Sequence, residues 1–293
     1  MSAKSAIEWT DATWNPVTGC SKVSHGCKHC YAEREWPRLQ HLPAYTGRAF
    51  TDVRCHPERL HEPLRWRRPR KIFVCHNADL FHEAVPFEFV EQVWDVIARR
   101  LDHTFQILTK RPERLLEFHR WLAGGDDISI TEWPRNAWVG VSVEDQPTAD
   151  ERIPLLLQTP AAVRWVSAEP LLSDIRLGSW LQRSPSEAFV AGKVTPEQPA
   201  WTRIGSTAID WVVAGGESGP KARPSYPDWF RSLRHQCRTA GVPFFFKQWG
   251  EFEPVESWPS PDKERDGNPA MIRVGKRAAG RMLDGRTWDE YPA

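Results

Sequence analysis

Three of the six cysteines lie close together in the sequence. Cys20, Cys27 and Cys30 fall within eleven residues, with the spacing C-x6-C-x2-C. An Asn-Pro turn signal precedes the first of them, and Gly19 and Gly26 stand directly before Cys20 and Cys27. Three convergent thiolates are typical ligands of a zinc ion or of an iron–sulfur cluster. The spacing therefore predicts a metal centre held by these three cysteines.

The composition restricts the class of protein. The chain has 293 residues, enough for one large domain such as an α/β barrel. Its 39 Lys and Arg residues nearly balance 38 Asp and Glu residues, so a nucleic-acid footprint would have to be local. The first residues lack the apolar core of a signal peptide, and no run of about 18 apolar residues occurs. We therefore expect a cytoplasmic protein without membrane contact, whose clustered cysteines are ligands and not disulfides.

Short apolar runs alternate with helical patterns along most of the chain. Residues 7–9 lead into the cysteine loop as a first strand, and further runs predict strands at 71–76, 104–109, 137–142, 163–167, 210–214 and 242–247. Helical spacing follows the cysteines over 27–42 and recurs near 90–101, 115–122, 149–158 and 229–240. This alternation indicates an α/β fold with parallel strands, curled into a full or partial (β/α) barrel. A flat doubly wound sheet is the alternative.

We expect a single domain over residues 1–293, with the cysteine loop after the first strand. Residues 176–208 are polar and contain three prolines, which is typical of an insertion or lid. Residues 250–293 show no strong periodicity, so we expect an irregular C-terminal extension there.

Polar residues follow the predicted strands, where the catalytic groups of such folds lie. Besides Lys110-Arg111 and Lys247-Gln248, the set that we expect to line one cavity above the cysteine loop is Asn77, Asp79, Ser142, Glu144, Glu169 and Glu217. Each residue taken alone could be a helix cap or part of a turn. Because several strand ends share the pattern, a lined cavity is the better interpretation.

The number of clustered cysteines distinguishes two kinds of metal site. A structural zinc ion needs a fourth ligand, which His25 or His29 would have to supply. No second pair of close cysteines exists, and Cys55, Cys75 and Cys237 stand alone. An iron–sulfur cluster with one iron free of protein ligands explains a set of three better.

Several motifs carry a family resemblance over nearly the whole chain. They are WNPVTGC at residues 14–20, WVVAGGESG at residues 211–219 and FFFKQWG at residues 244–250. A three-cysteine loop after the first strand of a (β/α) barrel resembles the radical SAM superfamily. The three motifs together resemble more closely a radical-SAM-like family found largely in phages and prophages. The superfamily's usual spacing is C-x3-C-x2-C, so the first interval is longer here.

The resemblance implies a cofactor set and roles for particular residues. Cys20, Cys27 and Cys30 would hold a [4Fe–4S] cluster, and S-adenosylmethionine would chelate its open iron. A reductant such as flavodoxin or ferredoxin would supply the electron that cleaves the sulfonium and produces a 5′-deoxyadenosyl radical. The residues expected to contact the cofactor are Asn77 and Asp79 at its methionine end, Ser142 and Glu144 at the ribose, His29 at the adenine, and Glu169 and Glu217 on the same rim.

The substrate is the least determined part of the interpretation. Residues 65–71 form a basic stretch with a tryptophan inside it, which favours either a solvated loop or a phosphate-contacting strip beside the barrel mouth. Lys110-Arg111 and the arginines at 231, 234 and 238 could extend such a strip, and a nucleotide or nucleic-acid substrate would follow. The alternative is a zinc- or cluster-stabilised nucleic-acid-binding protein without catalysis.

Overall fold

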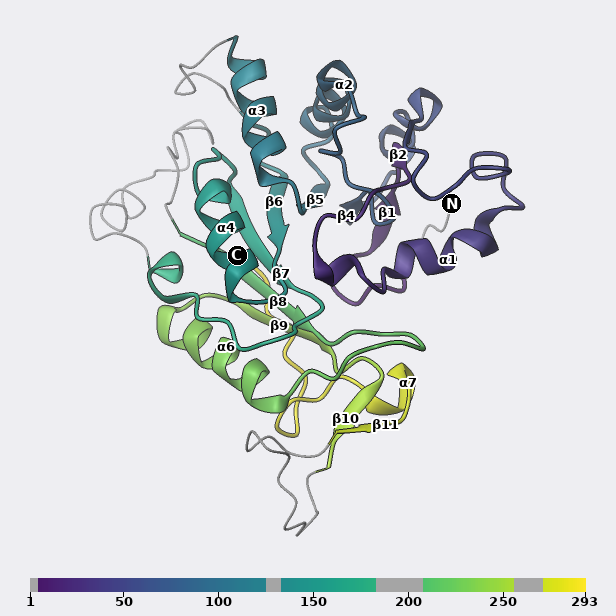
Figure 1. Cartoon of the computed structure of the whole chain (residues 1–293). Coiled ribbons are helices and arrows are strands. Elements are labelled where there is room, and N and C mark those ends of the chain that lie inside the picture. The colour runs from purple at the N-terminus through teal and green to yellow at the C-terminus, as the bar shows by residue number, and fades with distance from the viewer. Residues whose placement is uncertain (1–4, 125–132, 183–207, 256–270) are drawn as a thin grey trace.

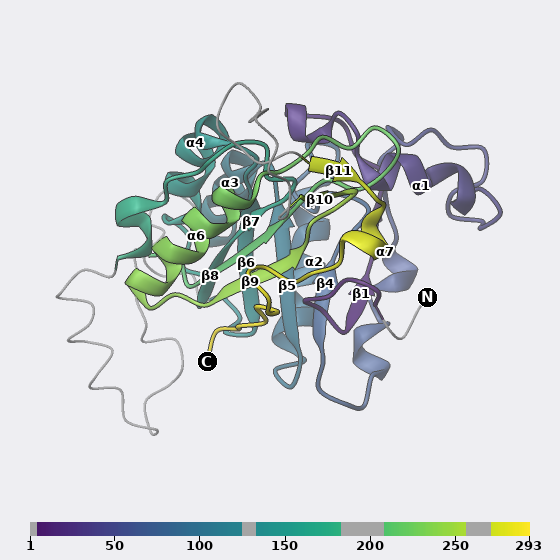
Figure 2. The ribbon, with the colours of Figure 1, turned by 90° about the horizontal axis from the view of Figure 1, so that it is seen from below.

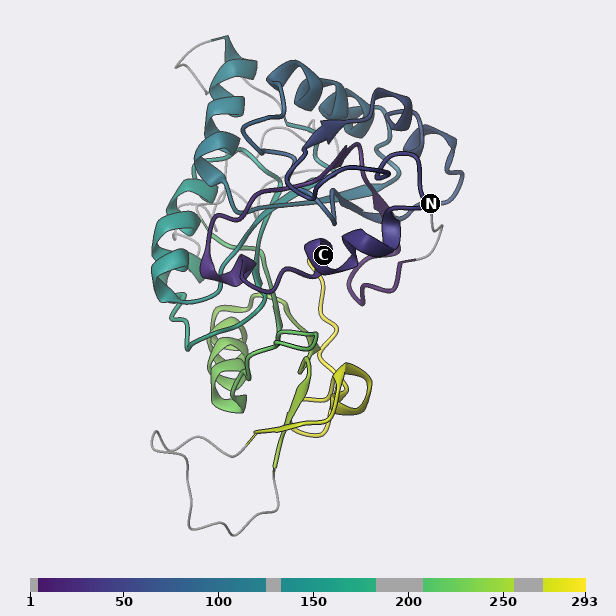
Figure 3. The same cartoon turned by 45° about the vertical axis from the view of Figure 1, so that its right-hand side comes forward.

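The computed structural model describes residues 5–124, 133–182, 208–255 and 271–293 (Figure 1). Seven parallel strands form the main sheet. In their order across the sheet they are β1 (Ala12–Trp14), β4 (Lys71–Val74), β5 (Thr104–Thr109), β6 (Ala137–Ser142), β7 (Val163–Ala168), β8 (Trp211–Gly215) and β9 (Phe244–Gln248). The spatial order follows the chain order without reversal, which is barrel topology and not that of a doubly wound sheet. The sheet curls into a half-barrel (Figure 3).

Helices connect the strands and cover the outer face of the sheet (Figures 1 and 2). They are α2 (Phe87–Ala98), α3 (Pro112–Ala123), α4 (Gln146–Leu156) and α6 (Pro227–Ala240). In α2 the buried side chains recur at helical spacing, at residues 89, 90, 93, 94, 96 and 97. α1 (Tyr31–Leu39) lies apart from this layer, beside the cysteine loop.

The remaining elements are short. They are the antiparallel pairs β2 (Val17–Thr18) with β3 (Arg54–Cys55) and β10 (Phe252–Pro254) with β11 (Met271–Arg273), the helix α7 (Lys276–Ala279), and the 3₁₀ turns η1 (His25–Cys27), η2 (Pro57–Arg59), η3 (Pro63–Arg65) and η5 (Gly178–Leu181).

The two faces of the sheet contribute to different clusters of buried side chains. Successive side chains of a strand point to opposite faces, so Ile72 and Val74 of β4 join the core beneath the helices. Phe73 joins a separate cluster with Trp9, Trp165, Trp211, Val213 and Phe245. Several of the sixteen tryptophans thus fill the half-barrel itself.

The first strand differs from the expected one. β1 comprises Ala12–Trp14, whereas residues 7–9 are not a strand. Trp9 packs instead against Phe73 and Trp165, with ring centroids 4.6 and 5.2 Å away. Its backbone carbonyl accepts a hydrogen bond from Gln106 Nε2 at 3.2 Å. Residues 7–9 read as a strand because the apolar Ile7 and Trp9 alternate with Glu8, but these two side chains pack in the cluster on the concave side of the sheet.

The end of the chain is packed against the core, although most of its backbone is irregular. Leu283 and Trp288 are buried in the main core. Asp289 bridges Phe245 in antiparallel fashion, and Phe246 N donates to Trp288 O at 2.9 Å. The terminal segment therefore covers the open edge of β9. Residues 256–270, within the same extension, lie outside the described residues.

The expected insertion at 176–208 is described only at its two ends. Residues 183–207 lie outside the described residues. Leu177, Leu181 and Ala208 are buried, and Ile209 N donates to Trp180 O at 2.7 Å. The two ends of the expected insertion therefore belong to the core.

Candidate functional site

The cysteine loop lies across the carboxyl end of the sheet. Gly19 has φ +88°, and a Cβ there would lie 2.5 Å from Asp52 O, so only glycine fits. Gly19 also bridges Ala78, and Cys20 N donates to Phe50 O at 2.9 Å. These contacts hold the start of the loop beside the segment that follows β4.

The three clustered cysteines line a single cavity of about 490 Å³. All three are free thiols and half-buried. The residues predicted from strand ends that share the cavity wall with them are Asn77, Asp79, Ser142, Glu169 and Glu217, and His29 joins them. Glu144 is absent from this wall. The structure thus brings most of the predicted rim together with the cysteines.

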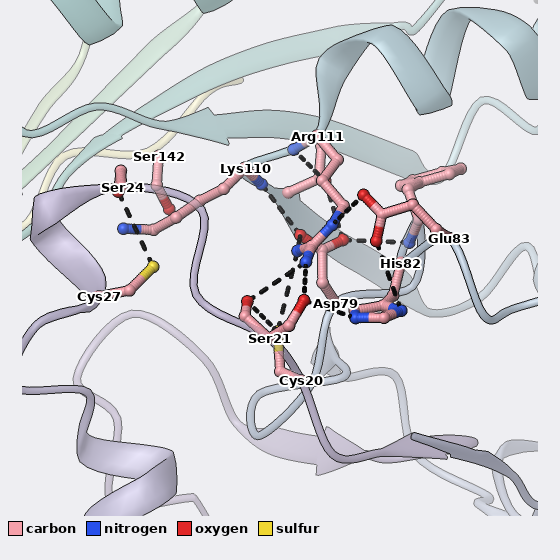
Figure 4. Close-up of polar contacts among 12 residues, drawn as sticks. Cys20, Ser21, Ser24, Cys27, Asp79, His82, Glu83, Lys110, Arg111 and Ser142 are labelled. Atoms are coloured by element: carbon pink, nitrogen blue, oxygen red, sulfur yellow. Dashed lines mark hydrogen bonds and ion pairs between the residues drawn. The ribbon is translucent and has the colours of Figure 1, made fainter. Parts of the chain in front are cut away.

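Arg111, at the start of α3, connects the Cys20 side of the loop to the sheet (Figure 4). Its Nη1 lies 3.8 Å from Cys20 Sγ and 3.2 Å from Asp79 Oδ2. Its Nη2 donates to Ser21 Oγ at 2.8 Å and to the Ser21 carbonyl at 3.2 Å, and Nε donates to Glu83 Oε1 at 2.9 Å. Arg111 is only 4% exposed, so its charge is neutralised by carboxylates inside the protein.

Lys110 reaches toward the Cys27 side of the same loop. In Figure 4 its ammonium group lies beside Ser24 and Cys27. Lys110 Nζ pairs with Glu144 Oε1, which also accepts from Ser24 Oγ at 3.1 Å. Arg152 Nη1 lies 3.2 Å from the other oxygen of Glu144. Ser24 Oγ in turn lies 3.8 Å from Cys27 Sγ.

The three thiols have different proton affinities. Burial raises the pKa of Cys20 to about 12, against the opposing influence of Arg111. Burial also raises the pKa of Cys30. At Cys27 burial acts in the same direction, but Lys110 and nearby hydrogen bonds outweigh it and lower the pKa. Cys27 is therefore the thiol of the three that ionises most readily, and a bound metal would have to displace the protons of Cys20 and Cys30 against a raised pKa.

Asp79 and Glu144, which we predicted to contact the cofactor, both bind other groups of the protein. Asp79 Oδ1 accepts from Thr109 Oγ1 at 2.8 Å and from Phe81 N at 3.0 Å, while Oδ2 accepts from Lys110 N and Arg111 Nη1. Glu144 is fully buried between Lys110 and Arg152. These residues hold the site's cations in place.

Glu217 is likewise occupied by a protein cation. Arg223 donates to Glu217 through Nη2 at 2.7 Å and through Nε at 2.8 Å, and the backbone N of Arg223 adds a third bond at 2.8 Å. Burial by itself would raise the pKa of Glu217, but the bonds from Arg223 hold it below its usual value. The side chain lines the cavity as an ionised, paired carboxylate.

Four other wall residues carry buried oxygens that accept no hydrogen bond within the described part of the chain. They are Glu8 Oε2, Asn77 Oδ1, Glu169 Oε1 and Gln248 Oε1. Asn77 Nδ2 donates to Tyr45 Oη, Gln248 Nε2 donates to Gly216 O, and Glu169 Oε2 lies 2.5 Å from Lys247 Nζ. A buried acceptor without a donor costs about 1–3 kcal/mol. A ligand that brings N–H or O–H groups into this cavity would relieve that cost.

The basic stretch at 65–71 lies at the other end of the sheet, and the prediction of a strip beside the barrel mouth is wrong. The stretch leads into β4, so it lies at the amino edge, whereas the cavity lies beyond the carboxyl ends. The guanidinium of Arg70 lies over the Trp66 ring, and the Lys71 ammonium over the Tyr291 ring.

The arginines of α6 also do not extend such a strip. Arg231 and Arg234 pair with Asp284, at 2.7 and 2.6 Å, and Arg234 and Arg238 lie over the Trp288 ring. They bind the terminal segment of the chain.

Three free thiols of one loop line the same cavity, and thiolates are the ligands that an iron–sulfur cluster takes. Among the described residues, no group of three or more His, Cys, Asp or Glu side chains is arranged to hold one metal ion. His25, a candidate fourth ligand, lies 2.8 Å from Asp145 and outside the cavity wall. His29 is in the wall.

The sequence placed Lys110 and Arg111 at a strand end but did not show that they contact the cysteine loop. As polar residues after a strand, they resembled helix caps. The available signal was the type of residue: a buried Arg directly after a strand requires carboxylate partners, and Asp79 and Glu83 supply them.

The chain belongs to the family described as "Protein of unknown function (DUF5131)", whose model matches residues 4–292. No curated protein and no solved structure matches it. Within the described ranges, no helix combines the length and apolarity needed to cross a membrane.

Proposed function

We propose that this DUF5131 chain is a radical SAM-type enzyme. Cys20, Cys27 and Cys30 would hold a [4Fe–4S] cluster, and S-adenosylmethionine would occupy the adjoining cavity. The observation that carries the proposal is the convergence of three free thiols of one loop on one cavity, at the carboxyl end of a parallel half-barrel. When bound and reduced, such a cluster supplies the electron that cleaves the sulfonium of S-adenosylmethionine.

The chain's own residues would bind and orient the cofactor. The unpaired oxygens of Asn77, Glu169 and Gln248 are acceptors for its amine, hydroxyl and adenine N–H groups. Terminal amide and carboxylate torsions are soft, so these oxygens can turn toward a ligand at small cost. Trp9, Phe73 and Leu108 supply apolar wall that keeps water from part of the cavity.

The wall also restricts how a nucleotide substrate would be held. Its Lys and Arg side chains, within the described residues, each lie near a carboxylate: Arg34, Lys110, Arg111, Lys247 and Lys276. A phosphate entering this cavity would have to compete with those carboxylates. We therefore propose that a nucleotide or nucleic-acid substrate would be recognised by its base or sugar within the cavity.

Anaerobic reconstitution tests the proposal. The protein is supplied with iron and sulfide, reduced with dithionite and mixed with S-adenosylmethionine, and 5′-deoxyadenosine is measured. Production that depends on both reductant and cluster would support the proposal. Reconstituted protein that binds iron and sulfide but forms no 5′-deoxyadenosine would overturn the assignment as a radical enzyme. One zinc per chain, without sulfide, would favour a zinc-stabilised binding protein.

Matched cysteine variants make the test specific. Cys20→Ala, Cys27→Ala and Cys30→Ala should each abolish the brown chromophore. Cys55→Ala is the control, because Cys55 is half-buried in β3 and outside the cavity wall. Equal loss of iron in Cys55→Ala would refute the ligand assignment.

A further inference from the structure

Two consecutive residues at the end of β5 support two different cysteines. Lys110 lies on the Cys27 side of the loop, and Arg111 lies on the Cys20 side (Figure 4). One dipeptide thus places a positive charge beside each of these two thiols.

Arg111 is held rigidly in its position. Each of its three nitrogens donates a hydrogen bond, to Glu83, to Asp79 and to Ser21, and Nη1 also points at Cys20 Sγ. The planar guanidinium fixes the directions of these bonds together, which an ammonium group cannot do. Ser21 Oγ forms a second hydrogen bond, with His82 Nε2 at 2.8 Å.

Lys110 is held by a buried carboxylate. Glu144 pairs with Lys110 and is itself held by Arg152 Nη1. Arg152 Nη1 also donates to the Ser142 carbonyl at 2.7 Å. Ser24 connects the two parts of this arrangement, because its hydroxyl contacts both Glu144 and Cys27 Sγ. The Cys27 side therefore has a polar support separate from that of Cys20.

We propose that Lys110 and Arg111 are positioning residues with different tasks: Lys110 stabilises the reduced form of the cluster, and Arg111 holds the Cys20 side of the loop so that the cluster is retained. The inference rests on the proposed function, since it requires a cluster on these cysteines. A cluster with three thiolate ligands is negatively charged, and an electron from an external one-electron reductant adds to that charge. Nearby cations and donors to the ligand sulfurs favour the more negative state. No bond to Lys110 or Arg111 forms or breaks.

The two residues should be separable by variants. Lys110→Met keeps the length of the side chain and removes the charge. We expect it to retain iron and to lower the midpoint potential of the cluster, measured by EPR during a reductive titration. Arg111→Lys keeps the charge but loses the planar fork that holds the Cys20 side. We expect iron to be released to a chelator several-fold faster than from the unaltered protein.

Arg114→Met is the matched control. Arg114 lies one turn further along α3, pairs with Glu117 and is outside the cavity wall. Arg114→Met should change neither the midpoint potential of the cluster nor the rate of iron release. Circular dichroism would show that all three variants are folded. An unchanged potential in Lys110→Met would overturn the inference for Lys110, and unchanged iron release in Arg111→Lys would overturn it for Arg111. Unaltered protein that binds a cluster but does not cleave S-adenosylmethionine refutes only the proposed function, while a protein that takes up no iron refutes both.

Discussion

Replacing Gly26 by alanine should destabilise the protein through Glu144, a buried residue in the loop that follows β6. Gly26 has no left-handed backbone angle, so the backbone itself accepts an alanine. There is no room for the methyl group, because a Cβ at residue 26 would lie well inside van der Waals distance of Glu144 Cγ, Cδ and Oε1. Glu144 is fully buried, and its side chain would have to move by about 1 Å to restore a normal contact.

The expected magnitude follows from what Glu144 holds. Its displacement weakens the pairs with Lys110 and Arg152 and the bond from Ser24. Removing one partner of a buried ion pair costs about 3–5 kcal/mol, and a displaced partner should cost somewhat less. Alanine also lowers the conformational entropy of the unfolded chain relative to glycine, which stabilises the folded protein by about 0.4–1 kcal/mol. We expect a net loss of about 2–3 kcal/mol, or about 3–5 °C in melting temperature for a chain of 293 residues.

Thermal melts and urea titrations of matched variants check this value. Gly215→Ala is the control, because a Cβ at Gly215 meets Glu169 at an ordinary 3.4 Å and should cost little. In Gly26→Ala, shortening the buried side chain by Glu144→Asp should recover part of the loss, a coupling that a double-mutant cycle detects. If Gly26→Ala melts like Gly215→Ala, or if the two changes are additive, η1 does not pack against Glu144 as described.

Two further predictions concern the half-buried ring of His76 and the buried ring of Trp288. Burial lowers the pKa of His76 from 6.5 to about 4, so the unfolded chain takes up the proton first and the free energy of unfolding should fall as pH decreases from about 6.5 to 4. His76→Gln should show a shallower fall in urea titrations across that window, and equal slopes would contradict the assignment. Trp288→Ala should cost about 3–5 kcal/mol because this ring is buried in the core, whereas Trp121→Ala, at a 38% exposed ring, should cost much less. Similar losses at both positions in chemical denaturation would show that the terminal segment is not packed on β9.

The sequence predicted the sheet well where burial is continuous. The expected bounds of β5 and β6 agree with the structure, since each strand is a short apolar run between polar segments. The first strand was misplaced because Trp9 is as apolar as a strand residue but fills the concave face. Trp288 and Leu283 gave no periodic pattern, since isolated buried residues in an irregular segment leave none.

The sequence predicted where the candidate site lies better than it predicted what each of its residues binds. Parallel strands bring their carboxyl ends together, so most of the rim residues indeed share one cavity with the cysteines. Whether a carboxylate faces a ligand or a neighbouring cation depends on contacts between distant segments. Glu144 pairs with Arg152 of α4, the helix that directly follows it, and Glu217 pairs with Arg223 in the segment after β8. Strand-end position carries no information about such partners.

The packing of indole rings inside the half-barrel has an optical consequence. The ring centroids of Trp9, Trp165 and Trp211 lie 5.2 to 6.3 Å apart, and the rings are tilted by 37° to 85°. Electronic transitions of rings this close and mutually inclined couple as excitons, so the protein should have an intense near-ultraviolet circular dichroism band. Trp165 and Trp211 belong to the neighbouring strands β7 and β8, whereas Trp9 comes from the N-terminal segment, so the couplings of Trp9 exist only while that segment is docked on the sheet. The part of the band that is lost in Trp9→Phe would therefore report docking of the N-terminal segment without any added label.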